Sequence, residues 1–294
     1  PAVKNLFETL SKKGYRTTFV PVDREGRLDL DFLYDHLTDD TAVVSLMWAN
    51  NETGVIFPIE ELSLKVKKLG IVFHTDAVQT AGKIPIDVSR TGVDMLSLSG
   101  HKIHAPKGIG VLYLRKGTRF SPFMIGGHQE RGRRGGTENT AAIIGLGKAA
   151  ELAKQHLDSG SYRCVDELRD QLECEILKRV PSTLVNGDRA NRLPNTTRLA
   201  FEYVEGEPIL LMLNEYGICA SSGSACTSGS LEPSHVLRAM GVPFTAAHGS
   251  IRFSLSRYTT QSDIDLVLEK LPPIIARLRE MSPFWKGAKL EAHG

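Results

Sequence analysis

The strongest constraint on the fold is a regular alternation of short apolar runs with helical segments in the first half of the chain. Residues 42–48 and 95–99 are typical of strands, and a weaker run covers residues 17–22. Residues 60–69 have an apolar face at helical spacing, and Gly70 follows them as a stop signal. Strands that alternate with helices of this length indicate a mainly parallel sheet covered by helices. We therefore expect an α/β fold.

The pattern changes near Ser159, where a polar, glycine-containing stretch breaks a long helix. Beyond it, strands and helices are mixed, and the last helix begins near Ser262. We expect Pro272-Pro273 to interrupt that helix, because proline lacks the backbone N–H that a helix needs. The sequence therefore predicts a large domain over residues 1–158 and a smaller α+β domain over residues 159–294.

Composition limits the classes of partner. The 294 residues carry 36 basic and 34 acidic side chains, so a net charge of +2 gives no general attraction to nucleic acid or to an anionic membrane. No apolar run reaches the roughly 18 residues that a membrane-spanning helix needs. No signal peptide is evident at the start of the chain. We expect a cytoplasmic protein that binds neither nucleic acid nor membrane.

The four cysteines lack both a metal-binding spacing and the density of a disulfide framework. Cys219 stands between Ile218 and Ala220, and Cys164 and Cys174 lie in a predicted helix, so we expect all three to be buried structural thiols. Cys226 differs, because serine, glycine, alanine and threonine surround it and offer no apolar stripe in which to bury it. We interpret Cys226 as a reactive thiol.

Two strand ends carry the polar residues on which a cofactor site depends. Asp76 ends the run that begins at residue 71, and Ser99-Gly100-His101-Lys102 ends the run from residue 95. Each has an ordinary interpretation: Asp76 as the cap of a following helix, and Lys102 as a surface residue. Together they offer an amine for a Schiff base, a carboxylate for a pyridinium nitrogen and donors for a phosphate. These are the needs of pyridoxal phosphate, and ligand sites of open α/β sheets lie at such strand ends.

Several motifs resemble those of the cysteine desulfurases, in class V of the fold-type I aminotransferases, along essentially the whole chain. Finer features resemble most closely the nitrogen-fixation branch of that family. The motifs are Trp48-Ala-Asn-Asn51-Glu-Thr-Gly54, Asp76-Ala-Val-Gln79, Ser99-Gly100-His101-Lys102, Gly127-His-Gln-Glu-Arg-Gly-Arg-Arg134, Ser222-Gly-Ser-Ala-Cys226-Thr-Ser and Ser254-Leu-Ser-Arg-Tyr258.

The resemblance implies a role for each matching residue around the cofactor. Lys102 would form the Schiff base and move the α-proton of the substrate, and Asp76 would keep the ring nitrogen protonated. Gln79 would bind the phenolic oxygen, and the Ser99-Gly100-His101 stretch would bind the phosphate. Thr137 would reach the phosphate of a second subunit, which makes a homodimer part of the site.

The resemblance also implies the substrate and the reaction. Arg252 would bind the substrate carboxylate as a two-pronged fork, and Asn51 would help to orient ring and substrate. L-cysteine would become L-alanine, and Cys226 would carry the sulfur as a persulfide to an iron–sulfur scaffold protein. Nitrogenase clusters would be its destination. No intrinsic metal site is expected, although Cys226 could ligate an iron–sulfur cluster transiently.

Three other interpretations remain open. A selenocysteine lyase, or another class V enzyme, would share the cofactor residues. His101, His104 and His128 could form a metal site, although this spacing is weak without further ligands. A truncated, non-catalytic binding module could use the arginines of residues 131–134 to hold an acidic partner or RNA.

The start of the chain departs from the family pattern. The chain opens at Pro1, directly before a helical pattern, and resembles the part of the family that follows its first segment. That segment, of roughly 100 residues, supplies a Gly-Thr phosphate-binding turn and a histidine that stacks on the cofactor. We therefore expect a truncated chain, and weak cofactor retention if this is the whole polypeptide.

Overall fold

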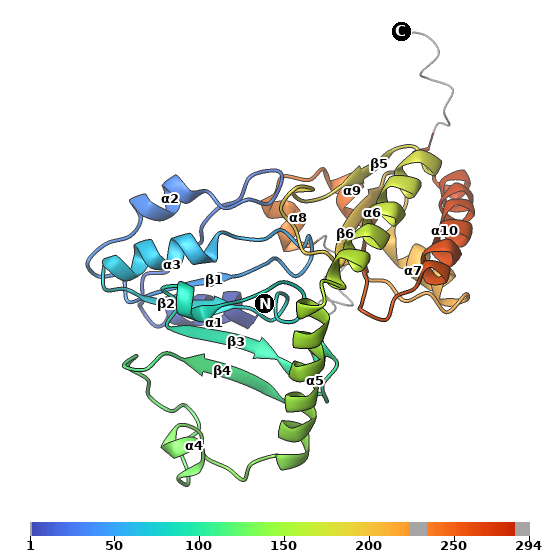
Figure 1. Ribbon diagram of the computed structural model, residues 1–294. Helices are drawn as coiled ribbons and strands as arrows, with labels where there is room; N and C mark the ends of the chain where they lie inside the picture. Colours follow the sequence, from blue (N-terminus) through green and yellow to red (C-terminus); the bar gives the residue numbers. More distant parts are fainter. Residues whose placement is uncertain (1, 224–233, 286–294) are drawn as a thin grey trace. The chain divides into compact units, whose positions relative to one another are not determined.

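The structure, a computed structural model, describes residues 2–223 and 234–285 (Figure 1). Its contacts divide the chain into two compact units. Residues 38–49 and 58–160 form one, which we call the parallel-sheet unit. The remaining described residues form the other, which we call the antiparallel-sheet unit.

The parallel-sheet unit is built on four strands in the order β1-β2-β3-β4. The first three run parallel, and β4 pairs antiparallel with β3. The strands are β1 (Val43–Met47), β2 (Val72–Asp76), β3 (Met95–Ser99) and β4 (Gly110–Leu114). Because β1, β2 and β3 are parallel neighbours, their carboxyl ends lie along one edge of the sheet. The expected α/β fold is therefore confirmed.

Helices complete this unit. Helix α3 connects β1 to β2, buries Leu62 and Val66, and packs against β2. It ends before Gly70, which has a φ of +73°, a left-handed conformation that glycine adopts without strain. The helices of the unit are α3 (Ile59–Lys68), η1 (Val88–Arg90), η2 (Gly100–Ile103), α4 (Gln129–Gly132) and α5 (Thr140–Asp158).

The antiparallel-sheet unit contains three strands in the order β5-β6-β7. Its core joins the apolar faces of α6, α7 and α10 to the central strand β6, all of whose residues are buried. The elements are α1 (Ala2–Lys12), α2 (Leu30–Asp35), α6 (Tyr162–Arg179), β5 (Thr183–Val185), β6 (Thr196–Phe201), α7 (Gly206–Asn214), α8 (His235–Ala239), α9 (Phe244–His248), β7 (Ser250–Ser254) and α10 (Gln261–Met281).

The expected interruption of the last helix is wrong, because α10 continues through Pro272 and Pro273. A proline at position 272 removes the N–H that would bind the carbonyl of Leu268 four residues earlier. In the structure, Arg179 Nη1 of α6 donates to that carbonyl at 3.3 Å. A neighbouring helix therefore supplies the donor that proline removes.

The expected strand at residues 17–22 is also wrong. The segment is irregular apart from a single bridge between Val22 and Leu28, and Phe19 is half exposed. Pro21 lies inside the run and has no N–H for a strand ladder, which accounts for the difference.

The predicted domains were two consecutive segments, 1–158 and 159–294. The contacts of the structure change at residues 160–161, close to the expected boundary. Residues up to Leu37 and residues 50–57 group with the C-terminal part instead of with the parallel sheet. The assignment of one domain to the cofactor and the other to Cys226 stays a prediction.

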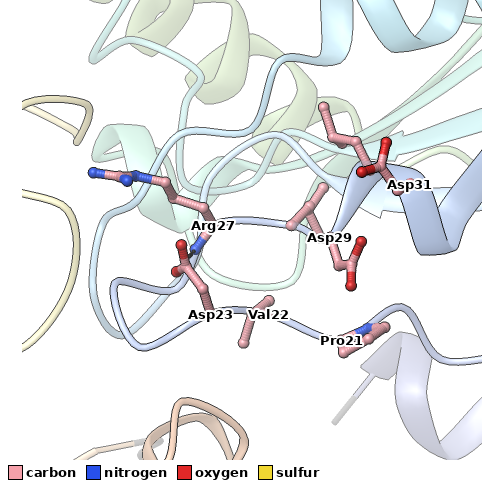
Figure 2. A pocket seen from close by; sticks show the side chains of 8 residues that line it. Pro21, Val22, Asp23, Arg27, Asp29 and Asp31 are labelled. Atoms are coloured by element: carbon pink, nitrogen blue, oxygen red, sulfur yellow. Dashed lines mark hydrogen bonds between the residues drawn. The ribbon is translucent and has the colours of Figure 1, made fainter.

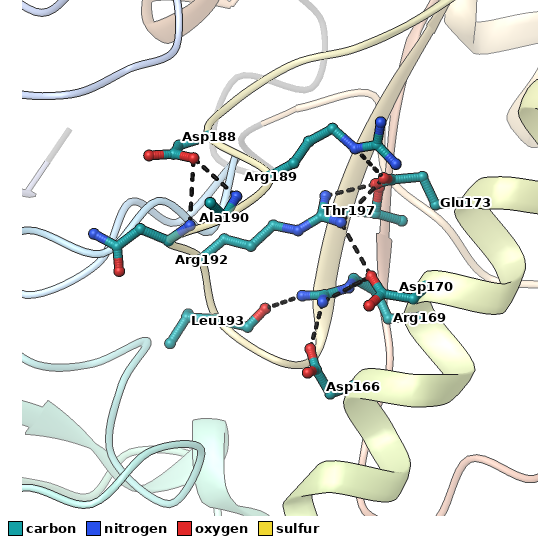
Figure 3. Close-up of polar contacts among 11 residues, drawn as sticks. Asp166, Arg169, Asp170, Glu173, Asp188, Arg189, Ala190, Arg192, Leu193 and Thr197 are labelled. Carbon is teal, nitrogen blue, oxygen red and sulfur yellow. Dashed lines mark hydrogen bonds and ion pairs between the residues drawn. The ribbon is translucent and has the colours of Figure 1, made fainter.

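A buried ion-pair network joins α6 to the segment before β6 (Figure 3). Glu173 of α6 is fully buried and accepts hydrogen bonds from Arg189 Nε at 2.9 Å, from Arg192 Nη2 at 3.0 Å and from Thr197 Oγ1 at 2.6 Å. Burial opposes ionisation of Glu173, but the bonds from Arg192 and Thr197 outweigh it and hold its pKa below the usual value. Arg169 extends the network to the carbonyl of Leu193 at 2.7 Å.

Replacing Glu173 by glutamine is expected to destabilise the fold by about 3 kcal/mol, because the buried Arg192 then keeps only the half-exposed Asp170 as an ion-pair partner among the described residues. Urea unfolding followed by circular dichroism would measure the change. The matched control is Glu175→Gln on the same helix, whose ion pairs with Lys178 and Arg179 are more exposed and whose loss should matter far less. Equal effects of the two substitutions would contradict the prediction.

Candidate active site

Lys102 lies in the short helix η2, which follows β3 directly. The turn is fixed by Gly100, whose N–H donates to the carbonyl of Ile109 at 2.9 Å. A Cβ atom at position 100 would lie 2.8 Å from Ile109 Cγ2, so this approach requires glycine. The carbonyl of Lys102 accepts from Lys83 Nζ at 2.7 Å, and Ile103 is buried against α5. The backbone of Lys102 is thus held on both sides.

Asp76 is the last residue of β2, and its register partner on β3 is Ser97. Its Oδ1 accepts from the N–H of Val78 at 2.9 Å, and the N–H of Ala77 donates to the carbonyl of Ser97 at 2.9 Å. The ordinary interpretation, that Asp76 caps a helix, is wrong, because residues 78–83 form turns. Gln79 is half-buried in these turns. Asp76 and the segment that carries Lys102 therefore follow adjacent parallel strands.

The predicted phosphate donors are in contact with each other. Ser99 Oγ lies 2.7 Å from Nδ1 of His101, so the hydroxyl at the end of β3 orients the imidazole of η2. Ser99 is half-buried and His101 is exposed. Thr137 is exposed in the segment between α4 and α5. Its predicted contact with a second subunit stays a prediction.

A histidine that the sequence patterns did not single out connects the three parallel strands. His74 of β2 has Nδ1 at 2.7 Å from Ser45 Oγ of β1 and Nε2 at 3.0 Å from Ser97 Oγ of β3. It lies on the same face of β2 as Asp76, two residues earlier. Burial lowers the pKa of His74, and the nearby Asp76 carboxylate opposes that shift only in part. A polar residue at alternate spacing from Asp76 on a buried strand was the signal that could have identified it.

His74 gives the stability a predicted pH dependence. Its pKa in the fold is lower than the ordinary value of about 6.5, so the unfolded chain binds the proton more readily. The stability that neutral His74 contributes is complete above pH of about 6.5 and is lost as the pH falls through the lower pKa of the fold.

We expect urea unfolding of the His74→Asn variant to depend less on pH than that of the parent chain in this window. Parallel unfolding of His36→Asn, which removes an exposed histidine of the other unit, tests whether loss of any histidine has the same effect. Identical slopes for the parent and His74→Asn would rule out this contribution.

The antiparallel-sheet unit brings together the two residues predicted to bind the substrate. Arg252 of β7 donates from Nη1 to the carbonyl of Asn51 at 2.6 Å. Its Nε is buried without a hydrogen-bond partner among the described residues. Burial lowers the pKa of Arg252, and the carboxylate of Glu52 opposes this shift. A half-buried guanidinium with an unused, buried Nε donor fits a carboxylate ligand, because an unpaired buried N–H is costly.

The cysteines correct one prediction and leave another outside the structure. Cys164, Cys174 and Cys219 are exposed, so the expectation that they are buried is wrong. On α6, both cysteines lie outside the buried stripe of Val165, Leu172 and Ile176, and Cys219 directly follows the buried Ile218. Cys226 lies outside the described residues.

Other features of the described chain do not form a competing site. A hollow of about 390 Å³ lies in the loop of residues 21–31 (Figure 2). Asp23 and Asp29 bind backbone N–H groups of that loop and of α2, and Arg27 binds Asp188 at 2.7 Å. Within residues 2–223 and 234–285, no three His, Cys, Asp or Glu side chains are arranged to hold a metal ion. None of the described helices combines the length and the apolar character that crossing a bilayer requires.

Comparison with known proteins shows the family. Residues 1–267 match the model of the family described as "Aminotransferase class-V". The chain belongs to the class V aminotransferase family. It is 62% identical over 287 residues to "Cysteine desulfurase NifS" of Azotobacter vinelandii. The aligned region covers 98% of this chain and 71% of that protein. A "Cysteine desulfurase" of Nostoc sp. strain PCC 7120 is 60% identical over 284 residues, covering 97% of this chain and 71% of that protein.

A solved structure of a protein named "NIFS-LIKE PROTEIN" supports the same relationship. The two structures superpose with a TM-score of 0.86 and are 37% identical in sequence. The match covers 94% of this chain and 73% of the other chain. The predicted resemblance to class V enzymes and the fold-type I architecture are therefore confirmed.

Class V aminotransferases use pyridoxal phosphate, which confirms the predicted cofactor. The residues of the parallel-sheet unit fit it chemically. The ends of β2 and β3 present a carboxylate at Asp76, an amine-bearing segment at Lys102 and a contacting hydroxyl–imidazole pair at Ser99 and His101. These groups match the ring nitrogen, the aldehyde and the phosphate of the cofactor.

Proposed function

We propose that this class V enzyme is a cysteine desulfurase that converts L-cysteine to L-alanine and passes the sulfur to Cys226. The observation that carries the proposal is the placement of Asp76 and the Lys102 segment after adjacent parallel strands. The cysteine desulfurases among the relatives support the choice of substrate.

Each residue has a stated task in this proposal. When bound, pyridoxal phosphate supplies an electron sink for negative charge on the substrate's Cα. Lys102 Nζ holds the cofactor and then moves the proton of Cα, and Asp76 keeps the ring nitrogen protonated. Ser99 and His101 donate to the phosphate. Gln79 donates to the phenolic oxygen.

The substrate is oriented by residues of the antiparallel-sheet unit in this proposal. Arg252 binds its carboxylate through the donors that Asn51 leaves unused. A lysine could not reproduce this two-pronged geometry.

The sulfur transfer balances without an external oxidant. The Cβ–S bond of L-cysteine breaks, and its electron pair stays on Cβ, which takes a proton to give alanine. The substrate sulfur joins Cys226 Sγ as a persulfide.

The wider role is part of the same proposal. An iron–sulfur scaffold protein would accept the sulfur, with nitrogenase clusters as the destination, and Cys226 could ligate a cluster transiently. A cytoplasmic homodimer completed by Thr137 would be the working form. The name of the Azotobacter relative is consistent with a nitrogen-fixation role.

The proposal is tested by incubating the purified chain with pyridoxal phosphate, L-cysteine and a reducing thiol. We expect equal amounts of alanine and sulfide. After one turnover without the thiol, mass spectrometry of alkylated peptides should find one additional sulfur on Cys226. Alanine formation with no additional sulfur on Cys226 would contradict the persulfide step. Turnover of selenocysteine but not of L-cysteine would favour a selenocysteine lyase.

A further inference from the structure

A fully buried ion pair lies in the antiparallel-sheet unit, and none of the roles above uses it. Glu52 and Arg198 form it, and both side chains have 0% exposure. Arg198 comes from the middle of β6, and its Nε also donates to Ser250 Oγ of β7 at 2.9 Å. Burial lowers the pKa of Arg198, an effect that the Glu52 carboxylate opposes.

The remaining hydrogen bonds of this pair go to both flanks of residues 224–233, the segment that contains Cys226. Arg198 Nη2 donates to the carbonyl of Ser222 at 3.1 Å. Ser234 Oγ donates to Glu52 Oε2 and also accepts from the N–H of Val236, at the start of α8. One ion pair therefore holds the residues on either side of the segment.

Gly223, at the first flank, is also a neighbour of the ion pair. A Cβ atom at position 223 would lie 3.5 Å from Arg198 Nη2 and 3.8 Å from Glu52 Oε2. Any side chain at position 223 would therefore be in van der Waals contact with both members of the ion pair.

The same pair adjoins the residues proposed to bind the substrate. Arg198 and Arg252 are register partners on β6 and β7, and Glu52 follows Asn51 in the chain. The backbone N–H of Arg252 donates to the carbonyl of Ser221 at 2.6 Å. Glu52 is thus a counter-ion to both Arg198 and Arg252. The flank is hydrogen-bonded to both strands, through Ser222 to Arg198 of β6 and through Ser221 to Arg252 of β7.

Stability alone is a weak explanation for this arrangement. Removing two charges from water costs free energy that their attraction often fails to recover, and apolar residues of similar volume are frequently as stable. In this protein the additional bonds of the pair reach Ser222 and Ser234, so the geometry that the pair imposes on these residues offers another explanation.

We propose that Glu52 and Arg198 are positioning residues that hold Ser222 and Ser234 so that the segment between them can present Cys226 to the substrate sulfur. The inference rests on the proposed function. It assigns a task to the glutamate of the Asn51-Glu52-Thr53-Gly54 motif and to the buried arginine of β6.

The test uses the double variant Glu52→Gln/Arg198→Met, which removes both charges together and avoids leaving one of them buried alone. Two substrates separate the steps. L-cysteine requires attack by Cys226 on its sulfur, whereas β-chloro-L-alanine loses chloride without that attack. We expect the rate of alanine formation from L-cysteine to fall about 10-fold to 100-fold, as misplaced reacting groups commonly do. Both rates are measured at saturating substrate, because loss of the Glu52 carboxylate beside Arg252 should raise the KM of both substrates. At saturation, chloride release should change by less than about twofold, because it does not need the positioned thiol.

Hydrogen exchange measures the positioning without catalysis. In the double variant, peptides covering residues 219–223 and 234–237 should exchange faster, and peptides of α6 should be unchanged. The matched control is Glu173→Gln/Arg192→Met, which removes another buried pair of the same unit that binds neither flank. It should leave the ratio of the two rates at the parental value.

Equal loss of both activities in Glu52→Gln/Arg198→Met, or unchanged exchange at the two flanks, would overturn the inference. Failure of the proposed function has a different signature. The parent chain would then release chloride from β-chloro-L-alanine but form no alanine from L-cysteine. The exchange measurement would still decide whether the pair holds the flanks.

Discussion

Replacing Lys102 by alanine is expected to remove the Schiff-base absorption band that pyridoxal phosphate gives with the parent chain. The substitution should also lower the conversion of L-cysteine by about 10³-fold or more, because a positioned base in this chemistry contributes factors of that order. The backbone of Lys102 is held by Lys83 and by the buried Ile103, so the loss should be chemical and not structural. Absorbance titration with the cofactor and an alanine assay would measure the two effects.

The control for this prediction is Lys107→Ala. Lys107 is an exposed lysine in the turn that follows η2, and its loss removes the same amine a short distance along the chain. It should keep both the band and the turnover. A band that persists in Lys102→Ala, or that disappears in Lys107→Ala, would place the cofactor on a different amine.

The parallel sheet and its edge could be predicted because local patterns determine them. The apolar run at residues 95–99 matches β3 residue for residue, and β1 and α3 differ from their predicted ranges by one residue at each end. Polar residues at the ends of such runs must lie at the sheet edge once the strands are parallel. The sequence therefore placed Asp76 at its strand end correctly, whereas the short helix η2 that carries Lys102 was not predicted.

Features that depend on distant partners could not be predicted in this way. The continuity of α10 depends on Arg179 donating to the carbonyl of Leu268, which is 89 residues away in the chain. The ion pair of Glu52 and Arg198 joins residues 146 positions apart. Contacts between residues so far apart in the chain do not change the local pattern of apolar and polar residues.

A compositional signal for the buried pair was nevertheless present. Residues 196–201 form the fully buried strand β6, and Arg198 lies in it. An arginine in a buried strand needs an anionic partner, because an unpaired buried charge is very costly. The partner had to be one of the acidic residues, and Glu52 stands in a motif between two polar neighbours. Charge in a buried strand therefore indicates that a partner exists but not which residue it is.

Replacing Cys226 by serine is expected to separate the reaction into its two halves. The variant should bind pyridoxal phosphate and L-cysteine as the parent does, because Lys102, Asp76 and Arg252 are unchanged. Sulfide and alanine formation should fall by about 10²-fold or more, since a serine hydroxyl is a far weaker nucleophile toward sulfur than a thiolate. Chloride release from β-chloro-L-alanine should stay at the parental rate, because that reaction needs no attack on sulfur.

The control variant is Cys219→Ser, since Cys219 is an exposed thiol only seven residues away in the chain. It should keep full activity toward both substrates, and alkylation should still find the transferred sulfur on Cys226. If Cys226→Ser retained cysteine conversion while Cys219→Ser lost it, the sulfur acceptor would be Cys219. The proposed positioning by Glu52 and Arg198 would then have to act on a residue that precedes both flanks, which their bonds to Ser222 and Ser234 do not favour.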